Sequence, residues 1–220
     1  MNKILLTGST GFIGSKFLKN LSKNNKVYVT LRKKNKKISK NKNIIKVYFN
    51  NFNNLNNKLK KINVDIVIHC ATHYVKQHEF SDINKLSESN ILFGNIILEN
   101  LKNMKVKKFI NFTTVWENFD GEKNNFFNLY SVYKKNFSNL ISFYNKKSNY
   151  TKFYNLFISD TFGEADKRRK IINLLRTNFK RNKLTTIVSK NLFLNLLNVE
   201  DIIAAANIIL KKNIVAGDYT

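Results

Sequence analysis

Three glycines stand three residues apart near the start of the chain, in the segment LLTGSTGFIGSKF. They are Gly8, Gly11 and Gly14, and the whole 220-residue sequence contains only seven glycines. The segment follows a short apolar run and precedes a helical pattern, and in that context a glycine-rich spacing indicates a dinucleotide site. The first glycine permits a tight turn, the second lets the backbone approach a pyrophosphate at the helix N-terminus, and the third allows the helix to pack closely on the strand.

Strand-like and helical patterns alternate along the rest of the chain. Short apolar runs predict strands at 3–6, 27–31, 46–49, 65–70, 109–113 and 153–158. Apolar residues at helical spacing predict helices at 91–104, 131–146 and 200–212. Strands separated by helices predict an α/β fold with a doubly wound parallel sheet, Rossmann-like, because right-handed crossovers join parallel strands. We expect residues 1–163 to form the dinucleotide-binding domain.

Composition narrows the class of protein. With 43% hydrophobic residues, no leader and no apolar stretch of membrane-spanning length, the sequence favours a globular cytoplasmic protein without a membrane partner. The single cysteine, Cys70, suits a reducing compartment. The formal charge of +25 attracts anions, but the basic residues are spread along the chain. The two local concentrations, 32–42 and 167–170, read as solvated loops as readily as binding sites, so nucleic acid is disfavoured as a partner.

Several segments together resemble a known family. Thr7 to Gly14 is similar to the fingerprint of the extended short-chain dehydrogenase/reductase family, of the NAD-dependent epimerase/dehydratase type. Further segments resemble family motifs in the expected order: DIVIHCA (65–71), NILFGN (90–95), YSVYK (130–134) and VED (199–201). The resemblance covers nearly the whole chain. It implies that Asn90 is the structural asparagine of the catalytic set, and that the cofactor contacts Thr7, Gly8, Thr10, Gly11, Phe12, Ile13, Gly14, Cys70, Ala71, Thr72, Tyr130 and Lys134.

Tyr130 and Lys134 form a pair with its own chemical logic. Four residues apart on a helix, they share a face, so an ammonium can lie near the phenol. Lowering a tyrosine pKa of ~10 by about three units requires roughly 4 kcal/mol, and one positive charge at ~4 Å in a partly screened site supplies about that much. We therefore expect Tyr130 to act as general acid or base beside Lys134. The alternative is an aromatic core residue next to a solvated lysine.

The family resemblance also assigns a hydroxyl at the end of the fifth strand. Gap-free alignment puts Thr114 in the catalytic place, ahead of Thr113, with a role in binding the substrate oxygen. Sugar-nucleotide 4,6-dehydratases carry an Asp-Glu pair directly after that threonine, whereas this chain has Val115 and Trp116, with Glu117 close by. The segment looks most like the 4-keto reductase branch that includes CDP-abequose and CDP-paratose synthases. We expect Thr114, Trp116 and Arg168 to bind substrate, with Arg168 as a diphosphate clamp.

The cofactor is predicted from the end of the second strand. NAD enzymes tend to place an acid there for the ribose 2′-hydroxyl, and an arginine accommodates a 2′-phosphate. Arg32 stands at this position, so we expect NADP, with Lys33 as a helper and NAD as the alternative. The family's adenine-binding aspartate is replaced by Asn50 and Asn51, of which we select Asn51. The three histidines fit no zinc spacing, and we expect no metal: His69, His73 and His78.

The resemblance implies an NAD(P)-dependent oxidoreductase or epimerase that acts on a keto sugar linked to a nucleoside diphosphate, with 4-keto reduction by NADPH favoured. An NAD-dependent 4-epimerase is the alternative, and a non-catalytic nucleotide- or RNA-binding module on the same fold stays open. Family members continue beyond the helix near Glu200, so we expect residues 164–220 to form a partial, truncated substrate lobe interleaved with the last sheet elements. Two explanations stay open: the sequence is a fragment, or the protein binds its substrate with a reduced lobe. A homodimer would supply a way to complete the substrate site.

Overall fold

The structure is a computed structural model that describes residues 1–32, 38, 41–168, 170–187, 189, 191 and 193–220. Lys33, the predicted helper of Arg32, lies outside the described residues, as does position 169 of the second basic cluster. The described residues form two compact units, 1–157 with 213–220 and 158–212. The predicted boundary at residue 163 separates a dinucleotide-binding domain from a substrate lobe, and this functional division stays a prediction.

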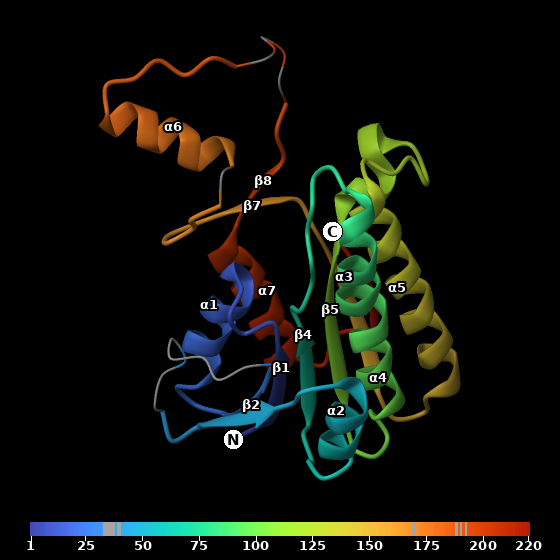
Figure 1. Ribbon diagram of the computed structural model, residues 1–220. Coiled ribbons are helices and arrows are strands. Elements are labelled where there is room, and N and C mark those ends of the chain that lie inside the picture. The colour runs from blue at the N-terminus through green and yellow to red at the C-terminus, as the bar shows by residue number, and fades with distance from the viewer. Residues whose placement is uncertain (33–37, 39–40, 169, 188, 190, 192) are drawn as a thin grey trace. The chain divides into compact units, whose positions relative to one another are not determined.

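The first unit contains a seven-stranded sheet in the order β3-β2-β1-β4-β5-β6-β9 (Figure 1). The registered strand pairs are parallel, which confirms the predicted doubly wound sheet. The strands are β1 (Lys3–Thr7), β2 (Lys26–Leu31), β3 (Ile44–Tyr48), β4 (Ile66–His69), β5 (Lys108–Thr114), β6 (Lys152–Ile158) and β9 (Gly217–Tyr219). The order reverses direction at β1, so β1 and β4 lie at the switch point where doubly wound sheets bind ligands.

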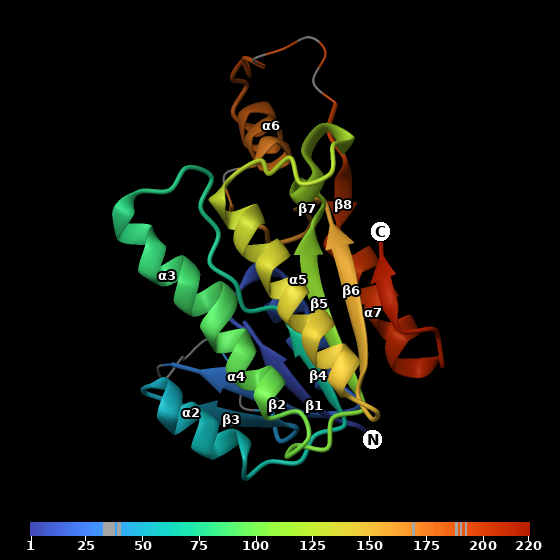
Figure 2. The same ribbon diagram turned by 90° about the vertical axis from the view of Figure 1, so that its right-hand side faces the viewer.

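Helices cover both faces of this sheet. Figures 1 and 2 show α2, α4 and α5 on one face and α1 on the other. The helical segments of this unit are α1 (Phe12–Leu21), α2 (Phe52–Leu59), η1 (Phe80–Asp82), α3 (Ile83–Ser87), η2 (Glu88–Leu92), α4 (Phe93–Glu99), η3 (Val115–Gly121) and α5 (Leu129–Lys147). The helix predicted over 91–104 begins earlier, because α3, the π-helical η2 and α4 run on without a break.

The main core lies between the sheet and the helices of the α2, α4 and α5 face. Leu5, Val67 and Phe109 point there from three neighbouring strands. Phe93 and Phe137 reach them from α4 and α5. These strands are buried on both faces, which explains why they appear in the sequence as continuous apolar runs. The core therefore holds rigid the strand ends from which the site residues project.

The second unit is smaller and is described by itself. It contains β7 (Asp160–Phe162), α6 (Ile171–Lys180), β8 (Leu196–Asn198) and α7 (Val199–Lys211), and β7 pairs in parallel with β8. The predicted helix over 200–212 is confirmed as α7, whose buried face includes Ile202, Ile203 and Ala206. No helix within the described ranges is both long enough and apolar enough to cross a membrane.

Gly14 is the position where the fold tolerates a side chain least. A Cβ built there would lie 2.1 Å from the Gly8 carbonyl oxygen, whereas a Cβ at Gly11 would lie 3.3 Å from the same atom. We expect Gly14→Ala to lower the free energy of unfolding by about 3 kcal/mol, since backbone on both sides must move. The matched Gly11→Ala should cost about 1 kcal/mol. Urea denaturation of both variants measures the difference, and equal losses would contradict the close approach at Gly14.

Candidate functional site

The glycine turn forms a compact cradle between β1 and α1. Gly8 adopts a φ of +66°, and a Cβ there would come within 2.6 Å of the Ala71 amide nitrogen. The Gly11 amide donates to the Gly8 carbonyl at 2.9 Å, and Gly11 is the N-cap of α1, so the cap residue itself offers no side chain to the first helical amides. The buried Ser9 hydroxyl has no hydrogen-bond partner among the described residues. An open helix N-terminus, a bare turn and an unpartnered hydroxyl fit a dinucleotide pyrophosphate.

The other predicted residues of the turn divide into buried and accessible positions. Thr7 is fully buried, and its hydroxyl accepts a hydrogen bond from the Ala71 amide at 3.0 Å and lies 3.1 Å from the His69 Nδ1. It therefore ties the end of β1 to the end of β4. Thr10 is exposed, and Phe12 and Ile13 are half-buried at the start of α1. The turn thus presents backbone and a few side chains at the switch point of the sheet.

Asn90 fixes the loop that follows β4. Its Oδ1 accepts hydrogen bonds from the Thr72 hydroxyl at 2.8 Å and from the His73 amide at 2.7 Å, and its Nδ2 donates to the His73 carbonyl at 2.9 Å. Asn90 lies in the π-helical η2, a type of distortion often found at functional sites. The buried Asn90 amide, with three hydrogen bonds to Thr72 and His73, holds Thr72 in place beside the half-buried Cys70 and Ala71.

The two threonines at the end of β5 have different surroundings. Thr113 is fully buried, and its hydroxyl donates to the Glu117 carboxylate. Thr114 is 6% exposed, and its hydroxyl accepts a hydrogen bond from the Trp116 amide at 3.3 Å while keeping its own proton to donate. The alternation of side chains along the strand separates the two hydroxyls, so Thr113 is committed to the interior.

Tyr130 and Lys134 both belong to α5, where the Asn128 capping box sets the start of the helix. Tyr130 is half-buried and Lys134 is only 4% exposed. Burial lowers the pKa of Lys134 to about 8, and the negative charge of Glu117 opposes this decrease. The pKa of Lys134 therefore depends on the burial of its side chain more than on the Tyr130 phenol.

The expected lowering of the tyrosine pKa is wrong for this structure. Burial raises the pKa of Tyr130 to about 12; the neighbouring Thr72 hydroxyl opposes the increase, and Tyr74 and the Glu117 carboxylate add to it. The simple pairing of one ammonium with one phenol left out desolvation, which disfavours the phenolate, and left out the buried acid between the same elements. Tyr130 is accordingly a neutral phenol at physiological pH.

An aromatic cluster surrounds Tyr130. Tyr74 meets it edge to face with ring centroids 5.1 Å apart, and Trp116 lies 5.9 Å from Tyr74. Phe127 continues the cluster, 4.9 Å from Trp116. Trp116 was predicted to contact substrate, whereas Tyr74 was missed. Tyr74 lies in the loop after β4, at the carboxyl edge of the sheet, and this position could have identified it from the sequence as a site residue.

The residues predicted to select the cofactor are near the ends of β2 and β3. Arg32 directly follows β2, with its guanidinium 3.7 Å from the Glu88 carboxylate and 5.7 Å from the centre of the Phe52 ring. Its side chain is 51% exposed, so it is open to a ligand. Asn51 caps α2, where its Oδ1 accepts a hydrogen bond from the Asn54 amide at 2.8 Å. Its backbone carbonyl also accepts a hydrogen bond from the Leu55 amide at 3.0 Å, so both of these contacts of Asn51 belong to the start of α2.

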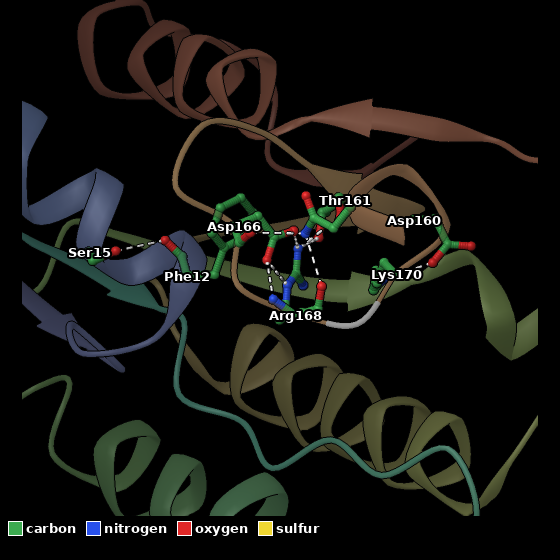
Figure 3. Close-up of polar contacts among 8 residues, drawn as sticks. Phe12, Ser15, Asp160, Thr161, Asp166, Arg168 and Lys170 are labelled. Carbon is green, nitrogen blue, oxygen red and sulfur yellow. Dashed lines mark hydrogen bonds and ion pairs between the residues drawn. The ribbon is translucent and has the colours of Figure 1, made fainter. Parts of the chain in front are cut away.

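Arg168 lies in the second unit, where an acid holds it in place. Its guanidinium donates to both carboxylate oxygens of Asp166, at 2.8 and 2.7 Å, and to the Thr161 carbonyl at 2.8 Å (Figure 3). The Asp166 side chain is fully buried and its pKa is lowered by these bonds, although its burial acts in the opposite direction. The predicted clamp is therefore preorganised by an internal ion pair. Figure 3 also shows the Ser15 hydroxyl, which donates to the Phe12 carbonyl in the first turn of α1.

His69, one of the three histidines, lies in the hydrophobic core. His69 is buried among the rings of Phe93, Phe109 and Phe137, and burial lowers its pKa to about 3. It is therefore a neutral core residue. Within the described part of the chain, no group of three or more His, Cys, Asp or Glu side chains could hold a metal ion.

Comparison with curated proteins finds relatives that act on nucleotide-linked sugars. The chain is 29% identical to a dTDP-D-glucose 4,6-dehydratase of Dictyostelium discoideum over its whole length, but spans only 58% of that protein. It is 28% identical to a CDP-abequose synthase of Yersinia pseudotuberculosis, with 92% of this chain and 71% of the relative aligned.

Solved structures give the same fold. A UDP-glucuronic acid 4-epimerase from Bacillus cereus, in complex with UDP-glucuronic acid and NAD, superposes with a TM-score of 0.81 at 21% identity, over 99% of this chain and 76% of that one. At this identity the likeness concerns the fold.

The sequence profile of the NAD dependent epimerase/dehydratase family matches residues 4–219, nearly the whole chain. The glycine turn and the Tyr130 and Lys134 pair are consistent with this match. The chain therefore belongs to the NAD-dependent epimerase/dehydratase family.

Proposed function

We propose that this protein is an NAD(P)-dependent oxidoreductase that reduces the 4-keto group of a sugar linked to a nucleoside diphosphate. The proposal is supported by three features: the bare glycine turn follows β1, Thr114 ends β5, and Tyr130 packs against Tyr74 in the loop after β4. Because β1, β4 and β5 are neighbouring parallel strands, their carboxyl ends lie at the same edge of the sheet. A nicotinamide dinucleotide bound at this edge supplies the hydride. Thr114 donates a hydrogen bond to the keto oxygen, and Tyr130 gives that oxygen its proton.

The state of Tyr130 supports reduction. A keto group that accepts a hydride at carbon must receive a proton at oxygen, so the enzyme needs an acid. The pKa of Tyr130, raised to about 12, keeps the phenol protonated in the free protein.

The segment after Thr114 gives no support to dehydration. Elimination needs a carboxyl group able to reach carbons next to the keto group. The two positions after Thr114 are Val115 and Trp116, and Glu117 is buried with its carboxylate on Thr113. Trp116 and Tyr74 instead offer apolar ring surface beside Tyr130, which suits the C–H face of a deoxysugar.

A 4-epimerase with tightly held NAD is the second candidate. It is favoured by the solved UDP-glucuronic acid 4-epimerase with bound NAD, which shares the fold over 99% of this chain. An epimerase oxidises and then reduces the same carbon, so it consumes no cofactor overall. A reductase consumes one NADPH for each product molecule.

Product analysis with cofactor accounting tests the proposal. The protein is incubated with NADPH and CDP-, dTDP- or UDP-linked 4-keto-6-deoxyhexoses, and the product is identified by NMR while NADPH absorbance is followed. We expect one NADPH lost per 4-hydroxy product. Epimer formation without loss of NADPH would favour the second candidate. Retention of RNA at saturating NADPH, with no turnover of any sugar nucleotide, would favour a binding module.

Tyr130→Phe removes the proposed proton donor and little else. We expect turnover to fall at least about 100-fold with dinucleotide affinity nearly unchanged, because only the proton transfer is lost. Tyr133→Phe is the matched control, since the Tyr133 hydroxyl bonds Ser87 at 2.8 Å, away from this chemistry. Steady-state kinetics and calorimetry on both variants give the comparison. Full activity in Tyr130→Phe would require a different acid.

Arg32→Asp tests the proposed preference for NADP. We expect wild-type protein to bind NADPH more tightly than NADH, and the variant to lose about tenfold in NADPH affinity, because a charge-assisted contact to the 2′-phosphate is replaced by repulsion. Lys42→Asp is the control, with the same change of charge at an exposed position in the turn just before β3. Calorimetric titration of the wild type and both variants with NADPH and with NADH gives the affinities to be compared. Equal affinities of the wild type for both dinucleotides would contradict the assignment.

A further inference from the structure

The irregular segment η3 buries its acid and leaves its aromatic side chains closer to the surface. Glu117 is 1% exposed and is the one buried residue of η3, whereas Trp116 and Phe119 of the same segment are half-buried. Acids are among the residues least often buried, and burying a carboxylate costs free energy unless it is paired. Glu117 therefore needs partners within the fold.

The partners of Glu117 lie on two different elements. Its Oε1 accepts the hydrogen bond from the Thr113 hydroxyl of β5. Its Oε2 lies 3.9 Å from the Lys135 Nζ of α5 and accepts no hydrogen bond from the described residues. Thr113 is fully buried and the Lys135 side chain is 36% exposed, so the carboxylate connects a buried strand residue with a partly exposed helix residue. Glu117 thus bridges β5 and α5.

The bridge joins the two elements that carry the proposed catalytic residues, Thr114 on β5 and Tyr130 on α5. Between them, the Trp116 amide donates to the Thr114 hydroxyl at 3.3 Å, and the Trp116 carbonyl accepts from the Phe127 amide at 3.2 Å. Residues 118–120 of η3 have non-helical dihedral angles, so no continuous helical ladder fixes this segment. A charge-assisted hydrogen bond from the buried carboxylate therefore contributes more to its placement than either neutral contact.

We propose that Glu117 is a positioning residue: by bridging β5 and α5 it holds η3, and with it the Trp116 ring, against the aromatic cluster beside Tyr130. Thr113 orients the carboxylate, and the neighbouring Thr114 keeps its proton for the substrate. Glu117 acts through these neighbours and transfers no proton itself. The inference rests on the proposed function for its effect on turnover, whereas the placement of Trp116 is measured without any ligand.

Trp116 is the only tryptophan of the chain, so its fluorescence reports directly on η3. The double variant Thr113→Val with Glu117→Leu replaces both hydrogen-bonding partners by apolar groups of similar size, which is nearly neutral for stability. We expect acrylamide to quench the Trp116 fluorescence of this variant about twofold more strongly than that of the wild type, because η3 opens locally. Circular dichroism and urea denaturation verify the fold. Unchanged quenching in the folded variant would overturn the proposal.

Single substitutions on α5 and in η3 test each part of the bridge. Lys135→Met removes the charge that faces Glu117 and should increase the quenching, whereas Lys135→Arg keeps the charge and should restore the wild-type value. Asp120→Asn removes an acid from an exposed position of the same segment and is the matched control, with no change expected. If the double variant does not fold, Lys135→Met carries the test, and wild-type quenching there overturns the bridge.

Kinetics separate positioning from a general loss of structure. The glycine turn lies on other elements, so the double variant should bind NADPH as tightly as the wild type, while kcat/KM for the 4-keto sugar nucleotide falls about tenfold through misplaced contacts. An equal loss of NADPH affinity and turnover would indicate a merely structural role and overturn the inference. If the wild type reduced no 4-keto sugar nucleotide, the proposed function would fail, while the fluorescence of the same variants still decided the role of Glu117.

Discussion

The tight passage of the backbone through the glycine turn, where no side chain fits, is the constraint on which the candidate dinucleotide site depends. The Gly8 carbonyl meets α1 where a Cβ at Gly14 would lie 2.1 Å away, and Gly8 itself is packed against the amide of Ala71. This approach brings the N-terminus of α1 and the end of β4 to the same point. Thr7 then joins the two strands through the Ala71 amide. A dinucleotide pyrophosphate needs such a surface without side chains, because its oxygens must reach peptide N–H groups.

Burial is the second constraint, and it determines the protonation states of the candidate catalytic groups. It raises the pKa of Tyr130 to about 12 and lowers that of Lys134 to about 8, so each group is pushed toward its neutral form. A neutral phenol is the acid that keto reduction requires, whereas a neutral amine would be of no use to a dinucleotide. The buried Glu117 affects both groups in the same electrostatic sense: its negative charge favours the ammonium and disfavours the phenolate. One acid thus favours the two protonation states that the proposed reaction needs.

Most of the fold could be predicted from the sequence, because a doubly wound sheet repeats a simple pattern. Strands such as 27–31 and 153–158 are buried on both faces and stand out as apolar runs, and the glycine spacing marks the first turn. The site was predicted less completely. The α5 pair follows from a four-residue spacing, but its pKa values depend on desolvation, which spacing does not reveal. Glu117 and Tyr74 lie in irregular segments after β5 and β4, where no periodicity predicts which way a side chain points.

The large net charge of +25 has little influence on this chemistry. Charges at the surface act through water and ions, and their effect falls off within about 8 Å at physiological ionic strength. They attract anionic ligands such as a sugar nucleotide, whichever side chains carry them. Lys134 is different because it is 4% exposed and interacts with a carboxylate that is 1% exposed. In a chain so rich in lysine, therefore, burial is what distinguishes Lys134 from the surrounding bases, whose charges are screened by solvent and ions.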